Sequence, residues 1–174
     1  MEPGGALTVG DVAGRGLRAV ATMGRLRAAT HSLAALDLTP DEMLARLDDL
    51  MVRLVDEGGP DAVGDPGEGQ PSTAGCAYVI YDPASRRVDV ACAGHSPPIL
   101  IHPDGHAEPV EAPLGPLLGN GGPPFDTWES ELPKGSSSPS TATDSSASAR
   151  PTASHGFSAC SASRTPACRR RATR

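Results

Sequence analysis

The sequence lacks several features that would each point to a particular class of protein. Its 174 residues contain no apolar run long enough to cross a bilayer and no signal-peptide pattern. Its four cysteines have no spacing typical of a disulfide framework or a metal site, and Cys76 and Cys92 lie in apolar runs where buried thiols are ordinary. We therefore expect a cytoplasmic protein with no membrane segment.

Positive charge is scarce over most of the chain. Residues 1–135 carry 20 acidic and 9 basic side chains, a balance of 9 − 20 = −11, which argues against nucleic acid as a partner. Residues 136–174 carry one acidic side chain and six arginines, a balance of 6 − 1 = +5. This second segment has no Leu, Ile, Val or Met, so it cannot bury enough apolar surface to offset the entropy of ordering. We expect a folded domain over 1–135 and a disordered tail over 136–174.

Two helices are predicted before residue 60. Residues 17–36 are rich in Ala, Leu, Met and Arg, which favour helix. One face of this helix is expected to pack closely, and it contains Leu17, Val20, Ala21, Gly24, Ala28 and His31. A second helix is indicated by a capping box of Thr39 and Glu42, with Pro40 at the first helical position. Apolar residues then recur at helical spacing over 43–54 and are expected to enter the core.

Strands are predicted in the second half of the chain. Apolar or alternating runs, separated by turn residues, occupy 75–81, 87–93, 99–101, 107–111 and 125–132. Short turns between successive strands favour an antiparallel meander. The predicted fold class is therefore α+β, with two helices covering one face of an antiparallel β-meander.

The most informative motif is GDVAGRG at residues 10–16, which follows an apolar run and precedes the first helix. Asp11 places a carboxylate where a strand ends, and the glycines allow a sharp turn and the close approach of a ligand. Hard divalent cations prefer carboxylate and carbonyl oxygens, so Asp11 is a candidate metal ligand. An alternative role for Asp11 is to cap the following helix.

A second interpretation of this region is a dinucleotide-binding site. Residues 14–19, GRGLRA, match the G-x-G-x-x-A fingerprint after a strand. That fingerprint requires a parallel sheet, which the predicted meander does not supply. We therefore favour the metal-ligand interpretation.

Three motifs in order resemble the PPM-type (protein phosphatase 2C-like) serine/threonine phosphatases, and in particular their sporulation stage II protein E (SpoIIE) branch. They are the Gly-Asp motif at 9–17, AGHSPP at 93–98 followed by PDG at 103–105, and PLGPLLG at 113–119 followed by ELPKG at 131–135. The resemblance covers residues 5–135. It implies a partial PPM-type α/β-sandwich.

The resemblance also implies an activity, hydrolysis of phosphoserine in signal transduction. In this family two Mn²⁺ or Mg²⁺ ions activate a water for attack on phosphorus. Asp11 would be the catalytic carboxylate that bridges the ions, and Val12 would contribute its backbone carbonyl. The implied partner is a phosphoprotein substrate, an antagonist of an anti-sigma factor.

The sequence departs from the family pattern at two places. The family has an acidic motif one hairpin upstream, whereas Gly4-Gly5 is followed here by Ala6. The family also has an aspartate in a later apolar strand, where this chain has a Ser-, Thr- and Ala-rich run after Gly135. We hypothesise that this run is frameshifted, because moving TCN and ACN codons back one base yields an apolar strand ending in Tyr-Ser-Asp-Gly. AGC codons at those serines would refute the hypothesis.

The departures have a chemical consequence. One carboxylate and one carbonyl cannot hold two divalent ions that prefer about six oxygen ligands each. We therefore predict that this polypeptide is a catalytically impaired phosphatase. The alternative is a non-catalytic interaction module, derived from such a phosphatase, whose helical layer binds a regulator.

Overall fold

The structure is a computed structural model that describes residues 4–14, 16–57, 73–122, 124–133, 137–140 and 155–164. Its first half contains strand β1 (Gly4–Val12) and helices α1 (Gly16–Leu33) and α2 (Pro40–Glu57). The strands that follow are β2 (Ala74–Asp82), β3 (Arg87–Ala93), β4 (Ile99–Ile101), β5 (Ala107–Pro109), β6 (Leu114–Gly115), β7 (Trp128–Glu131), β8 (Ser137–Ser140) and β9 (His155–Arg164). Among the described helices, none is long and apolar enough to cross a membrane.

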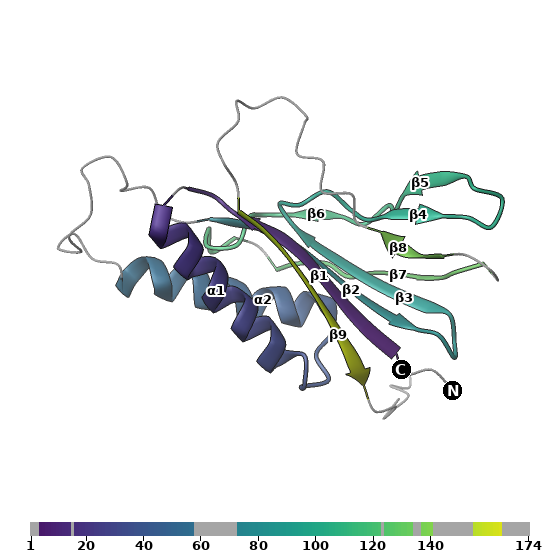
Figure 1. Cartoon of the computed structure of the whole chain (residues 1–174), viewed down its shortest axis with the longest axis horizontal. Helices are drawn as coiled ribbons and strands as arrows, with labels where there is room; N and C mark the ends of the chain where they lie inside the picture. The colour runs from purple at the N-terminus through teal and green to yellow at the C-terminus, as the bar shows by residue number, and fades with distance from the viewer. Residues whose placement is uncertain are drawn as a thin grey trace.

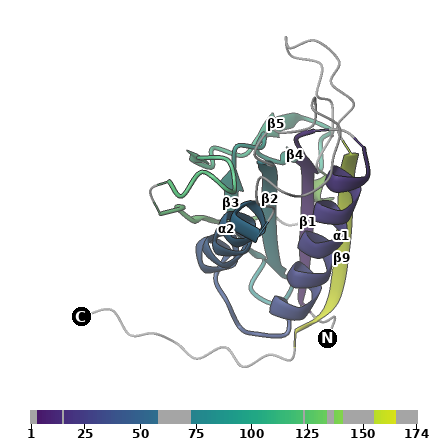
Figure 2. The ribbon, with the colours of Figure 1, turned by 90° about the vertical axis from the view of Figure 1, so that its left-hand side faces the viewer.

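The strands form two sheets. The larger has the order β6-β3-β2-β1-β9, with β7 also paired to β3, and the smaller has the order β5-β4-β8. Strand β2 pairs antiparallel with β1 on one side and with β3 on the other, whereas β4 and β5 belong to the smaller sheet. Both helices lie along the same face of the larger sheet, and β4 and β5 lie away from them (Figures 1 and 2). The predicted α+β class, two helices on an antiparallel sheet, is confirmed.

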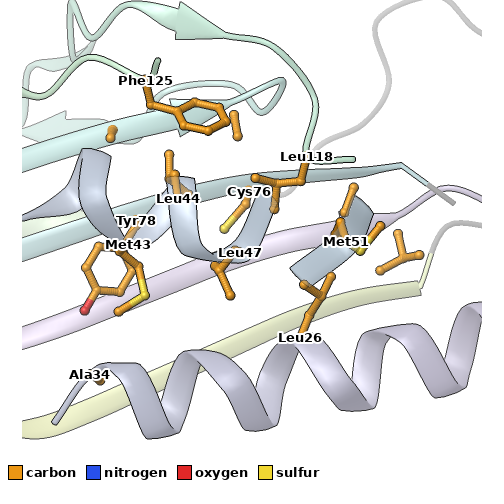
Figure 3. Packing of buried hydrophobic residues seen from close by; sticks show 14 of the residues in the cluster. Leu26, Ala34, Met43, Leu44, Leu47, Met51, Cys76, Tyr78, Leu118 and Phe125 are labelled. Carbon is orange, nitrogen blue, oxygen red and sulfur yellow. The ribbon is translucent and has the colours of Figure 1, made fainter. Parts of the chain in front are cut away.

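Helix α2 provides most of the helical side of the core. It begins at Pro40, and the Thr39 N–H donates to the Glu42 Oε2 at 3.0 Å, which is one of the two hydrogen bonds of the predicted capping box. The predicted apolar stripe is confirmed as core, with Met43, Leu44, Leu47 and Met51 fully buried. Figure 3 shows these side chains in one cluster with Leu26 of α1, Cys76 and Tyr78 of β2, and Phe125.

Helix α1 packs with a different face from the one predicted. Its buried residues are Ala19, Leu26 and Thr30, whereas the side chains of the predicted face are exposed. Leu17 is 83% and Val20 is 44% exposed. The prediction was wrong because apolar side chains are distributed around this helix, so helical spacing alone defines two candidate faces.

A second core lies on the sheet face away from the helices. Val88, Val90 and Cys92 of β3 share this face, as their alternation predicts, and pack with Leu100 of β4. Trp128 of β7 is partly buried against the same cluster. The larger sheet is therefore covered on both faces.

Two features of the sheets differ from the sequence-based expectations. Strand β6 lies between two of the predicted strands, in a Gly- and Pro-rich segment for which no strand is predicted, and it pairs parallel with β3. Strands β8 and β9 lie within the segment expected to be disordered, and β9 pairs antiparallel with β1. The outer edge of β1 offers unpaired backbone groups that an extended segment of almost any composition can satisfy. The other residues of 136–174 lie outside the described residues, and the domain boundary at 135 stays a prediction.

Candidate functional site

Asp11 is the penultimate residue of β1 and lies opposite Gly75 of β2. The strand continues through Asp11 to Val12, so the carboxylate belongs to the strand end and not to the following loop. Side chains alternate along a strand, so Asp11 shares its face with Leu7, which packs against the second core. Asp11 is half-buried there, whereas Val12 faces the helices and is fully buried.

The carboxylate of Asp11 occupies the space above Gly75. A β-carbon at position 75 would lie 2.8 Å from the Asp11 Oδ1 and 3.4 Å from the Gly94 carbonyl oxygen. A carboxylate oxygen and a carbonyl oxygen therefore border the same small space. We call Asp11, Gly75 and Gly94 the Gly75 site. Only a residue without a side chain at position 75 leaves room for the Asp11 carboxylate in this place.

The segment Leu114–Gly119, which we call the strap, holds both glycines of the Gly75 site in place. The Gly94 N–H donates to the Gly115 carbonyl at 2.9 Å. Leu118 exchanges two hydrogen bonds with Ala74, the neighbour of Gly75, at 2.9 and 3.1 Å. Gly94 has a φ of 58°, and the Leu117 side chain occupies the space that a side chain at position 94 would need.

Two thiols flank the site in the sheet. Burial raises the pKa of Cys76 to about 12, and the negative charges of Cys92 and Asp11 add to this effect. Burial raises the pKa of Cys92 to about 11. Both cysteines are free and buried, as expected. With raised pKa values both thiols stay protonated at neutral pH, so neither is an activated nucleophile.

The two alternatives for this region do not match the geometry. Helix α1 begins at Gly16, and Asp11 lies within the preceding strand, so its side chain does not cap the helix. The dinucleotide fingerprint needs a parallel βαβ unit, but β1 pairs antiparallel with both β2 and β9. Arg15, within that fingerprint, lies outside the described residues.

The donor set of this region is too small for a two-cation centre. Within the described ranges, no group of three or more His, Cys, Asp or Glu side chains could hold a metal ion. The site offers the Asp11 carboxylate and nearby backbone carbonyls, whereas Mn²⁺ or Mg²⁺ needs about six oxygen ligands each. The described residues therefore do not fit the binuclear metal site that the sequence resemblance implies. The assignment of Asp11 and Val12 as metal ligands stays a prediction.

Sequence reasoning missed the contributions of Gly75, Gly94 and the strap. A signal for Gly75 was present, because a glycine inside an apolar strand often marks the close approach of another group. Its neighbour was not predictable, because the register that sets Asp11 against Gly75 depends on how β1 and β2 pair across more than 60 intervening residues.

Comparison with known proteins identifies the family to which this chain belongs. The family model for stage II sporulation protein E (SpoIIE) matches residues 3–138. Among solved structures, the chain is similar to the RsbU and RsbW domains of Rv1364c from Mycobacterium tuberculosis, with 28% identity and a TM-score of 0.60. It is also similar to RsbX crystallised in complex with magnesium, with 16% identity and a TM-score of 0.57, a likeness that shows the fold alone.

Both structural matches cover 78% of this chain, but they cover only 34% of the first protein and 59% of the second. The chain thus corresponds to part of each of these longer proteins. No curated protein matches it.

Proposed function

Because the chain belongs to the SpoIIE family of serine/threonine phosphatase domains, we propose that it is a metal-dependent protein phosphatase domain in which Asp11 is the retained cation ligand. The position of Asp11 supports this proposal. Its carboxylate stands at a strand end, half-buried, over a glycine and beside a carbonyl oxygen. A carboxylate placed in this way contributes little to the core, and its environment suits a hard cation.

The substrate class that we propose is a phosphoserine protein, an antagonist of an anti-sigma factor. The support is the likeness to a protein that carries RsbU and RsbW domains, together with the family match. When bound in a complete centre, the cations would supply an activated water and charge neutralisation for phosphate ester hydrolysis. What this chain contributes is the anchoring carboxylate of Asp11 and a glycine at position 75 that leaves room for it.

We further propose that this polypeptide hydrolyses phosphate esters poorly or not at all. The reason is the donor set, since the described residues supply a single carboxylate where a two-cation centre needs several. The test is hydrolysis of p-nitrophenyl phosphate with Mn²⁺ by the full chain, beside its Asp11→Asn variant. Equal, background rates are expected. Manganese-dependent turnover that disappears in the variant would show that the metal centre is complete. It would refute the proposal that the chain is catalytically impaired.

Cation binding is tested separately from turnover. Mn²⁺ broadens the NMR signals of nearby nuclei, so the backbone amides of Asp11 and Gly75 report on a bound ion. We expect selective broadening in the unmodified chain and its loss in Asp11→Asn. The matched control is Asp49→Asn, which removes an exposed carboxylate on α2 far from the strand end in sequence. If broadening persists in Asp11→Asn, Asp11 is not the ligand.

One observation favours the alternative function, an interaction module without catalysis. Helix α1 exposes Leu17 and Val20 on the face away from the core, as a helical layer that binds a regulator would. The manganese titration separates the two functions. A chain whose Asp11 environment is unaffected by Mn²⁺ has lost the cation site, and the interaction module is then the better description.

A further inference from the structure

We propose that Asp48 of helix α2 is a positioning residue, which fixes the Gly75 site through the strap. This inference rests on the proposed function, because it concerns the same site. It assigns a role to a partly buried carboxylate that lies beside the buried residues Leu44 and Met51 on α2.

The first contact joins helix and strap. The Gly119 N–H donates to the Asp48 Oδ1 at 2.7 Å in a partly buried setting. A hydrogen bond to a carboxylate is shorter and stronger than one between neutral groups. Gly119 has a φ of 92°, a conformation that few other residues adopt, so the strap ends at a fixed point on the helix.

A second contact holds the segment that follows the strap. The Asp41 N–H donates to the Thr127 Oγ1 at 3.1 Å, and the Thr127 hydroxyl donates to the Asp41 Oδ1 at 2.7 Å. Asp41 and Asp48 are seven residues apart, so they lie on the same side of α2. Helix α2 therefore forms hydrogen bonds with Gly119 and with Thr127, on either side of Phe125 in the sequence. Phe125 is buried in the core (Figure 3).

The strap then reaches the site at two places. Leu118 pairs with Ala74 through two hydrogen bonds, which fixes the strand residue that precedes Gly75. The Gly115 carbonyl accepts from the Gly94 N–H, and the Leu117 side chain packs on Gly94. The position of the Gly94 carbonyl beside the Asp11 carboxylate therefore depends on the strap. The position of the strap in turn depends on Asp48.

The test compares Asp48→Ala with Asp48→Asn and with the control Asp49→Ala, using the full chain labelled for NMR. Asn keeps an oxygen that can accept from the Gly119 N–H, and Asp49 is a neighbouring exposed carboxylate. Amide hydrogen exchange is measured at Gly119, Gly94 and Val90, the last being a fully buried residue of β3. Broadening by Mn²⁺ is measured at Gly75.

We expect Asp48→Ala to raise exchange at Gly119 and Gly94 by about tenfold, as loss of a charge-assisted hydrogen bond and local opening imply. Val90 should stay protected, which distinguishes local loosening from general destabilisation. Asp48→Asn should retain most of the protection, and Asp49→Ala should match the unmodified chain. Broadening at Gly75 should fall in parallel in Asp48→Ala.

The proposal is overturned if exchange rises at Gly119 while Gly94 keeps its original rate, because the strap then does not transmit the change. A uniform rise that includes Val90 also overturns it, since Asp48 would then serve stability alone. If Mn²⁺ broadens no signal even in the unmodified chain, the proposed function fails, yet the exchange rates still decide whether Asp48 positions Gly94.

Discussion

The substitution Gly75→Ala is expected to weaken Mn²⁺ binding while leaving the free energy of unfolding nearly unchanged. A β-carbon at this position would lie 2.8 Å from the Asp11 Oδ1, about half an ångström closer than an ordinary carbon–oxygen contact. Its next neighbour, the Gly94 carbonyl oxygen, is 3.4 Å away, which is an ordinary contact. The new methyl group therefore displaces the end of one half-buried side chain and leaves the backbone in place.

The energetic consequences follow from this geometry. Removing a glycine from a strand interior stabilises the strand by roughly 0.5–1 kcal/mol, which offsets the cost of moving the carboxylate. We therefore expect the free energy of unfolding to change by no more than about 1 kcal/mol. The carboxylate no longer lies beside the Gly94 carbonyl, so affinity for Mn²⁺ should fall about tenfold, which corresponds to about 1.4 kcal/mol.

Urea unfolding measures the first quantity, and Mn²⁺ broadening of the Asp11 amide measures the second. The matched control is Gly5→Ala in β1, where a β-carbon would meet nothing within 4 Å. Both variants should unfold near the original midpoint, and only Gly75→Ala should lose the response to Mn²⁺. A large loss of stability in Gly75→Ala, or an unchanged Mn²⁺ response, would refute the geometry of the site.

Three further outcomes are expected. Burial raises the pKa of Cys76 to about 12 and that of Cys92 to about 11, from an ordinary value of 9.0. Just above pH 9, therefore, these thiols ionise in the unfolded chain but stay protonated in the folded one. Stability to urea should therefore fall above pH 9, by up to about 1.4 kcal/mol per pH unit for each thiol, and Cys92→Ala should halve that slope. Burial opposes ionisation of Asp41, but hydrogen bonds from Thr39 and Thr127 outweigh it and lower its pKa, so its contribution is present above about pH 4 and is lost in more acidic solution. Thr127→Ala should cost about 1 kcal/mol at pH 7 and less at pH 2, and an equal cost at both pH values would contradict this. Leu47→Ala, at a fully buried position, should cost about 2–5 kcal/mol in urea unfolding, and a loss below about 1 kcal/mol would contradict its place in the core.

The sequence predicted those parts of the fold whose signals are local. The bond from the Thr39 N–H to Glu42 and the apolar spacing of α2 are set by neighbouring residues, and both are found as predicted. The β3 strand has the predicted bounds and the predicted buried face. In each case one pattern favoured one structure, with no competing arrangement.

Features that depend on distant pairing were not predictable from local patterns. The packed face of α1 was assigned wrongly, because burial of Leu26 and Ala19 is decided by α2 and the sheet and not by the helix itself. Strand β6 contains two residues and owes its extended form to β3. The same holds for the site, where Asp11 was recognised from its motif but the roles of Gly75 and Asp48 depend on tertiary contacts.

The most direct test of the cation-ligand assignment is the map of Mn²⁺-induced broadening over all backbone amides of the unmodified chain and of Asp11→Asn. We predict broadening centred on residues 11, 75 and 94, which vanishes when the carboxylate becomes an amide. Broadening of equal strength in both proteins, or centred on the acidic surface of α2, would contradict it.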